Sequence, residues 1–158
     1  MDYRKASLND VRSVAVLFQD LTYHIKNSSK DVYWDFEELS LDTTEGVIKE
    51  YIENDESCIL VAEKNDEIVG MMIVEIIPCH MVLCSHKKVG YIVAGYVKEE
   101  HRRKGVMKEL EKLSNEFFRE LSIKYVEVCY LPENAGAKEA WNGMGYRCFR
   151  EQARKSVY

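Results

Sequence analysis

A strand pattern, a helix pattern and a second strand pattern follow one another in the C-terminal half of the sequence, and this order constrains the fold most. The first apolar run extends from Val89 to Val97, and the second from Tyr125 to Leu131. Between them, Gly105 to Leu121 carries apolar residues at helical spacing, which is typical of an amphipathic helix. Two strands joined by a crossover helix run parallel within one sheet. The sequence therefore predicts a sheet that is at least partly parallel.

Hairpin and helix patterns surround this unit. Two strand patterns, Cys58 to Glu63 and Ile68 to Ile77, are separated by a short polar turn, as in an antiparallel hairpin. The other patterns are an extended start at Tyr3, helices that begin near Ser7 and at Thr43, a helix from Asn134 to Met144, and a last strand from Tyr146 to Ala153. Without repeats or Pro- and Gly-rich linkers, we predict one domain over residues 1–158. Its class is α/β (α+β), with the order βααβββαβαβ and helices on both faces of a mixed, mostly antiparallel sheet.

The composition excludes several classes of protein. The formal net charge of −5 leaves no broad basic surface for nonspecific nucleic-acid binding, so an anion site would have to be local. No run reaches the roughly 18 apolar residues of a membrane span, and the N-terminus lacks the apolar run of a signal peptide. We therefore expect a cytoplasmic protein with no membrane or nucleic-acid partner. The five cysteines lack CxxC spacing and are expected to be reduced and mostly buried.

Three cations, Arg102, Arg103 and Lys104, precede the central helix pattern, and Lys108 lies one turn further on. The first N–H groups of a helix have no carbonyl partner within it, and the helix dipole favours an anion there. Gly105 allows a ligand to approach the backbone closely. Most short charge runs are solvated loops, but this one lies where a strand meets a helix. We therefore predict a phosphate-binding turn.

The strand before this turn contains Gly90 and Gly95. Glycine inside a strand often marks a bulge, or the close approach of another backbone or a ligand. We therefore expect the sheet to be bulged or splayed near Gly95, close to its middle.

The segment from Val89 to Leu110 resembles the acyl-CoA site of the GNAT superfamily, whose pattern is Arg or Gln, two residues, Gly, one residue, and Gly or Ala. Arg102, Gly105 and Met107 occupy those three places. A second segment resembles the family's Asn-x-x-Ala helix that ends in Gly and an aromatic residue, in Asn134, Ala137, Trp141, Gly145 and Tyr146. The resemblance implies a single-domain GNAT-like fold. It also implies an N-acetyltransferase for which acetyl-CoA is the acyl-donor cosubstrate.

A set of coenzyme A ligands follows from this resemblance. In the family, the turn holds the pyrophosphate, while the bulged strand offers backbone groups to pantetheine and to the acetyl carbonyl. Carried over, the cofactor-binding residues are Gly95, Tyr96, Val97, Arg102, Arg103, Lys104, Gly105, Val106, Met107, Lys108, Asn134 and Trp141. The backbone N–H of Val97 is then the expected donor to the oxyanion.

Two departures from the family leave the proton-transfer residues open. Trp141 stands where many members carry a tyrosine that protonates the departing thiolate, and because indole cannot serve as that acid, Tyr130 and Tyr146 are candidate substitutes. The strand before the turn has no carboxylate. Glu75 and Glu127 lie on flanking strand patterns, and Glu75 is the candidate base. A solvent-facing glutamate and rim tyrosines are the simpler interpretation of these residues. Direct attack by a neutral amine in a ternary complex needs no covalent enzyme intermediate.

The irregular stretch from Thr22 to Asp42 mixes aromatic and acidic residues, and both attract ammonium groups. Tyr33, Trp34 and Asp35 are therefore candidate substrate-binding residues for a small-molecule or peptide amine of cationic character. We expect no metal site, because the only soft ligands that cluster match no zinc spacing; they are Cys79, His80, Cys84 and His86.

Other functions stay open at this point. A noncatalytic acyl-CoA sensor or regulatory domain would use the same turn without the missing acid and base. A nucleotide-binding module is disfavoured, because neither GxxxxGK[ST] nor GxGxxG is present. A monomer and a homodimer are both compatible with the sequence.

Overall fold

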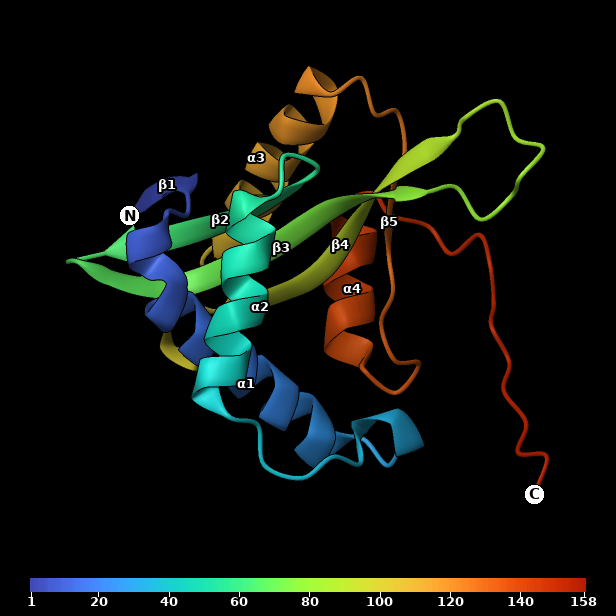
Figure 1. Cartoon of the computed structure of the whole chain (residues 1–158), viewed down its shortest axis with the longest axis horizontal. Coiled ribbons are helices and arrows are strands. Elements are labelled where there is room, and N and C mark those ends of the chain that lie inside the picture. Colours follow the sequence, from blue (N-terminus) through green and yellow to red (C-terminus); the bar gives the residue numbers. More distant parts are fainter.

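Five strands form a single sheet in the computed structural model, which describes all 158 residues. Side by side, they are β1 (Asp2–Lys5), β2 (Ser57–Lys64), β3 (Glu67–Pro78), β4 (Lys88–Val97) and β5 (Val126–Val128). Neighbours are antiparallel from β1 to β4, whereas β5 is parallel to β4. The predicted mixed, mostly antiparallel sheet with one crossover is therefore confirmed (Figure 1).

Four α-helices cover the two faces of this sheet (Figure 1). They are α1 (Val11–Ser28), α2 (Leu41–Glu53), α3 (Val106–Glu120) and α4 (Ala135–Gly143). Short 3-10 turns precede α1, α2 and α3, namely η1 (Leu8–Asp10), η2 (Val32–Trp34) and η3 (Glu99–His101). Side chains of α1 and α2 share one buried cluster with the sheet, and those of α3 and α4 share the other. Burying an apolar stripe of each helix in this way supplies most of the driving force for the fold.

The start of α1 is fixed by the buried carboxylate of Asp10. It accepts the backbone N–H of Ser7 at 2.7 Å and two N–H groups of Arg4 at 2.8 and 2.9 Å. These bonds satisfy a buried charge and join the first helix to strand β1, so the α1–α2 layer is held against the edge of the sheet.

A bulge interrupts the pairing of β3 with β4. Ile73 pairs with Ala94 and Val74 with Ile92, so Val93 is the extra residue on β4. The predicted irregularity is therefore present, and it lies just before Gly95. Beyond the bulge β4 has no strand neighbour on its other side, because β5 pairs only with Gly90, Tyr91 and Ile92. The sheet is thus splayed between β4 and β5.

Gly90 is required by packing on the α3 face. A Cβ atom at this position would lie 2.6 Å from the ring of Phe118, which is closer than real Cβ contacts allow. The glycine therefore lets a large aromatic side chain of α3 lie directly against the backbone of β4.

The last predicted strand is not formed. The order is βααβββαβα, and the residues from Tyr146 to the C-terminus form no helix or strand. The paired part of β5 is only three residues long. Side chains of the C-terminal residues contact other elements instead: Arg150 lies 3.8 Å from Glu127, and Arg154 contacts Asp31. Local alternation predicted a strand, but the edge that it would need is too short.

Two expectations from composition meet different outcomes. No helix has the length and apolar character that crossing a membrane requires. The prediction that the cysteines are mostly buried is wrong, because only Cys58 is buried and both Cys129 and Cys148 are exposed. Cysteines in apolar runs are usually buried, but these two lie at the short strand β5 and in the C-terminal segment, where little covers them.

Candidate active site

The turn between η3 and α3 is tied to the end of β4 by Arg102. Its Nε–H donates to the carbonyl oxygen of Val97 at 2.9 Å, and its guanidinium lies 5.5 Å from the ring centroid of Tyr96. The two terminal nitrogens of the guanidinium make no other hydrogen bond within the chain, so they remain able to bind an anion. Arg102 therefore both positions the turn and contributes charge to it.

The backbone of this turn adopts a conformation that suits an anion. Arg103 and Gly105 both have positive φ angles, 58° and 81°, on either side of Lys104. Turns of this kind direct successive N–H groups toward one side and form a concave anion site. Nothing lies within 4 Å of the place where a Cβ of Gly105 would be, so the chain leaves open space beside this residue.

The first turn of α3 adds free donors to this concavity. Glu109 N–H donates to the Gly105 carbonyl at 3.1 Å, but the N–H groups of Val106, Met107 and Lys108 donate to no group of the chain. These orphan N–H groups lie at the positive end of the helix dipole, close to the exposed side chains of Arg103 and Lys104. The turn therefore fits a phosphate or diphosphate.

Met107 and Trp141 do not point into this turn. A Cβ on Gly95 would lie 3.2 Å from the Met107 sulfur and 3.9 Å from the Trp141 ring, so both side chains lie beneath the splayed part of β4. Trp141 is buried, and its ring meets that of Tyr146 edge-on at a centroid distance of 5.3 Å. The larger residue at the third place of the motif therefore packs into the core and leaves the turn free.

The open edge of β4 exposes backbone N–H groups to the splay. Lys98 N–H donates to Val69 of β3 at 2.9 Å, so the alternation of a strand directs the N–H groups of Val97 and Gly95 to the other side. No strand occupies that side beyond Ile92. An extended ligand that enters from the turn can thus follow β4 and bond to its backbone.

The two candidate acids differ in their surroundings. The hydroxyl of Tyr146 donates to Glu111 of α3 at 3.3 Å, and burial together with the Glu111 charge raises the pKa of Tyr146 well above its usual range. A phenol held in this way is a weaker acid than the thiol it would protonate. Tyr130 is half-buried next to the same core and has no such partner.

Asn134, predicted as a cofactor ligand, caps α4 by accepting the Ala137 N–H at 2.9 Å.

Glu75 lies in a row with Tyr91 and Glu127 on neighbouring strands, on the face that carries α1 and α2. Burial and the charges nearby raise the pKa of Tyr91. Glu75 makes no hydrogen bond or ion pair, whereas Glu127 lies 3.8 Å from Arg150. Along β3, Glu75 is five positions from Gly70, the partner of Val97, which corresponds to about 17 Å. Gly95, opposite Met72, is only about 10 Å away on the same scale.

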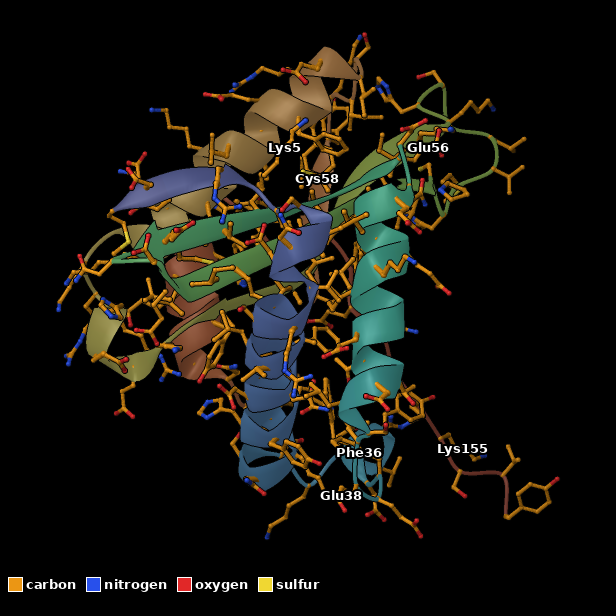
Figure 2. The ribbon with its side chains drawn as sticks, turned by 60° about the vertical axis from the view of Figure 1, so that its left-hand side comes forward. Lys5, Phe36, Glu38, Glu56, Cys58 and Lys155 are labelled. Atoms are coloured by element: carbon orange, nitrogen blue, oxygen red, sulfur yellow. The ribbon has the colours of Figure 1, made fainter.

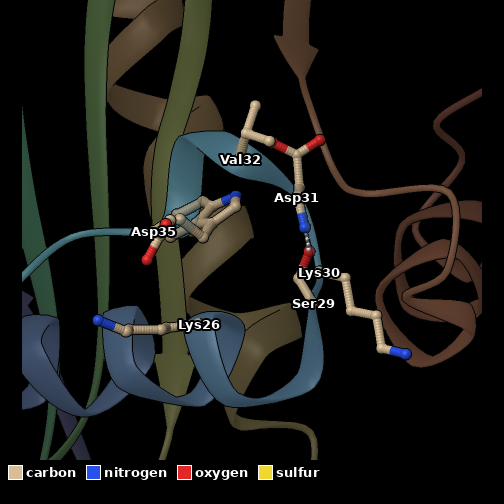
Figure 3. A pocket seen from close by; sticks show the side chains of 7 residues that line it. Lys26, Ser29, Lys30, Asp31, Val32 and Asp35 are labelled. Atoms are coloured by element: carbon tan, nitrogen blue, oxygen red, sulfur yellow. Dashed lines mark hydrogen bonds between the residues drawn. The ribbon is translucent and has the colours of Figure 1, made fainter.

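The predicted acceptor residues lie in and next to η2. Tyr33 is 78% exposed, and Trp34 lines a shallow cavity of about 240 Å³ together with Asp35, Lys26 and Asp31 (Figure 3). Asp31 is one of the acidic residues of this stretch, but the sequence did not single it out as a candidate ligand. Its carboxylate contacts Arg154, and no local pattern could indicate a pair separated by 123 positions.

The loop between β3 and β4 carries Cys79, His80, Cys84 and His86. The structure brings no three His, Cys, Asp or Glu side chains together in a way that could hold a metal ion. The His80 ring lies 6.2 Å from Phe149 and that of His86 4.9 Å from Tyr125, so both imidazoles make aromatic contacts.

Several solved structures share this fold at low sequence identity. The aminoglycoside 6'-N-acetyltransferase AAC(6')-IG from Acinetobacter haemolyticus matches with a TM-score of 0.79 and 16% identity, over 100% of this chain and 99% of that one. AAC(6')-Iy, in complex with the bisubstrate analogue CoA-S-monomethyl-acetylneamine, matches with a TM-score of 0.75 and 17% identity, over 99% and 95%. A ribosomal-protein-alanine N-acetyltransferase from Brucella melitensis biovar Abortus 2308 gives 0.71 and 14%, over 99% and 100%.

The comparison with curated protein sequences finds no match. The family described as Acetyltransferase (GNAT) family matches residues 22–146. That range includes the bulged strand β4, the turn with Arg102 and Gly105, and the whole of α3 and α4. The chain therefore belongs to the GNAT family of acetyltransferases.

Proposed function

We propose that the protein transfers an acetyl group from acetyl-CoA to a primary amine in a ternary complex. The observation that carries this proposal is the group of unpartnered N–H donors of Val106, Met107 and Lys108, next to Arg103 and Lys104 and beside the open edge of β4. Those donors suit the pyrophosphate, and the edge suits the amide groups of pantetheine. Neighbours with the same fold bind CoA-linked ligands, which supports this assignment.

The position of the reacting group follows from the direction of β4. The phosphate turn lies after Val97, so pantetheine would run back along β4 toward the bulge at Val93. The family resemblance implies that the Val97 N–H donates a hydrogen bond to the oxyanion. Measured along the sheet, however, Glu75 is about 17 Å from Val97 and about 10 Å from Gly95. A general base acts directly or through a water. With Glu75 as the base, we therefore propose that the Gly95 N–H donates to the oxyanion. The Val97 N–H then donates to pantetheine.

In this arrangement the chain acts mainly through position and backbone dipoles. A neutral amine attacks the thioester carbon, and a C–N bond forms as the C–S bond breaks. The nitrogen loses one proton to the base, Glu75, and the sulfur takes up one proton. Holding both reactants in line supplies much of the acceleration, and a fixed N–H beside the developing oxyanion supplies more. A thiol is a fair leaving group and needs little assistance, so the candidate acid is Tyr130, whose hydroxyl has no partner of the kind that Glu111 provides for Tyr146.

A noncatalytic acyl-CoA sensor is the second candidate function, and the aromatic residues beneath the splayed part of β4 favour it. Trp141 is buried there, and the Tyr146 hydroxyl is engaged by Glu111, so neither provides a free acid for the thiolate. Such a protein would bind coenzyme A through the same turn and acetylate nothing.

The release of free thiol from acetyl-CoA, measured with a panel of amines, separates these candidates. We expect turnover with at least one member of a panel made of a polyamine, an aminoglycoside, an amino acid and a lysine peptide. Tight binding of coenzyme A without turnover on any of them would favour the sensor.

The phosphate turn is tested by the pair Gly105→Asp and Gly105→Asn. Both side chains tolerate the positive φ at this position and can cap α3, so they differ essentially in charge. We expect calorimetric titration to show at least about tenfold weaker coenzyme A binding for Gly105→Asp than for Gly105→Asn, because the carboxylate repels the diphosphate. Equal affinities would show that the turn is not the pyrophosphate site.

A further inference from the structure

The guanidinium of Arg154 is bound by two residues of the segment around η2. Its Nη1 and Nη2 atoms lie 3.2 and 2.5 Å from the two carboxylate oxygens of Asp31. Its central carbon lies 4.2 Å from the ring centroid of Tyr33. A carboxylate fork and an aromatic face are the two features that recognise a cation, and here both contact the same group.

Asp31 is oriented by its own segment, independently of Arg154. Its Oδ1 accepts the backbone N–H of Tyr33 at 2.9 Å, and its own N–H donates to the Ser29 hydroxyl at 3.0 Å. In Figure 3, the carboxylate points out of the turn and away from Lys26. The bonds from Arg154 and Tyr33 hold the pKa of Asp31 below its usual range. The site is therefore preformed and anionic at neutral pH.

The segment that carries Arg154 is held only weakly. Every residue from Glu151 to Tyr158 is exposed, and none belongs to a helix or strand. Figure 2 shows Lys155 on this segment, extended away from the sheet and helices. An exposed ion pair competes with water and salt. A cation that arrives from solution can therefore replace the Arg154 side chain.

We propose that Asp31 and Tyr33 form a binding site for a second cationic group of the acceptor, and that Arg154 occupies this site until the acceptor displaces it. This inference rests on the proposed acetyl transfer for the identity of its ligand. The amine that attacks the thioester must be neutral, whereas a carboxylate and an aromatic ring stabilise a charged group. The group bound here is thus not the reacting one. The acceptors are accordingly amines with at least two basic groups, such as polyamines or compounds with a guanidinium.

Steady-state kinetics of the full chain tests this with spermidine and with propylamine, which carry several and one basic group. We expect Arg154→Gln to lower KM for spermidine by about 3- to 10-fold, since the competing side chain is removed, and to leave KM for propylamine unchanged. Lys155→Gln removes the same charge from a neighbouring residue that contacts neither Asp31 nor Tyr33, and we expect no change. Asp31→Asn should raise KM for spermidine, alone and combined with Arg154→Gln. An unchanged or higher KM for spermidine in Arg154→Gln would overturn the proposal.

A binding measurement separates this inference from the proposed function. A fluorescent peptide of residues 150–158 should bind to the Arg154→Gln variant, as measured by polarisation, and spermidine should displace it. The same peptide with glutamine in place of its Arg154, or the additional change Asp31→Asn, should abolish binding. Peptide binding without acetylation of any amine would support the cation site and count against acetyl transfer. Acetylation without peptide binding would reject the cation site alone.

Discussion

The turn that we propose for the phosphates and the cation site that we propose around η2 would bind opposite charges, and they are built in different ways. The turn consists of neighbouring residues between β4 and α3, its backbone supplies the N–H donors, and Val106 and Leu110 in the first turns of α3 are buried. The cation site joins Asp31 to Arg154, which are 123 positions apart, through exposed side chains. A ligand part common to all reactions suits a rigid backbone site, whereas a variable acceptor suits side chains that can be exchanged.

The largest expected effect concerns Glu75, which lies on β3 on the sheet face that carries α1 and α2. Glu75→Gln should lower kcat by about 100-fold at neutral pH and leave coenzyme A affinity unchanged, because a glutamine cannot take the proton of the amine. The deficit should shrink at high pH, where the amine is neutral without help. Glu127→Gln, on the same face but paired with Arg150, is the control. A wild-type kcat in Glu75→Gln would remove the glutamate from the mechanism.

A second change tests how rigidly β4, the strand proposed to bind acetyl-CoA, packs against α3. Gly90→Ala should lower the free energy of unfolding by about 1–3 kcal/mol, because the added Cβ would lie 2.6 Å from the Phe118 ring. Gly46→Ala is a matched control, since it lies within α2 with nothing within 4 Å, and we expect it to stabilise by about 0.5–1 kcal/mol. Urea denaturation measures both. Similar stabilities for the two variants would mean that β4 yields to α3 more easily than the packing indicates.

The third change concerns the bonds of Asp10 that hold the start of α1 against β1. Arg4 and the Ser7 N–H hold the pKa of Asp10 below its usual range. Its contribution to stability is therefore present above about pH 4, the unfolded value, and is lost as the pH falls toward the folded value. Asp10→Asn should cost about 1–2 kcal/mol at pH 7 in urea denaturation, and the difference from wild type should shrink in acid. A difference that is independent of pH would contradict this account.

The smallest expected effect lies where α1 contacts the stretch between η2 and α2. Tyr23→Phe removes the hydroxyl that accepts the Leu39 N–H at 3.0 Å, but keeps the ring at a centroid distance of 5.9 Å from Phe36. We expect a loss of about 0.5–1 kcal/mol in unfolding free energy and little change in coenzyme A affinity, both measurable by calorimetry. If coenzyme A binding weakened as well, the two regions would not be independent.

Local signals in the sequence predicted the structure of β4, the turn after it and α3 well. The amphipathic spacing of α3 and the cations before Gly105 indicated the turn, and glycines in β4 indicated the irregular strand. They succeeded because a helix terminus and a glycine act over a few residues. The same kind of signal failed for the strand predicted from Tyr146 to Ala153, since alternation cannot show whether a neighbouring edge is long enough to pair with.

The sequence by itself determined the family, the order of the helices and strands up to α4, and the presence of a turn with cations and Gly105 after β4. Each of these follows from patterns of residues that are close in the chain. Only the tertiary structure decided that Met107 lies under Gly95, that Glu75 is far from Val97 along the sheet, and that Arg154 contacts Asp31. Those relations arise when distant segments meet, and their energies come from packing and charge across the fold. The proposed cation site depends on such a contact, and for that reason it could not be predicted from local patterns.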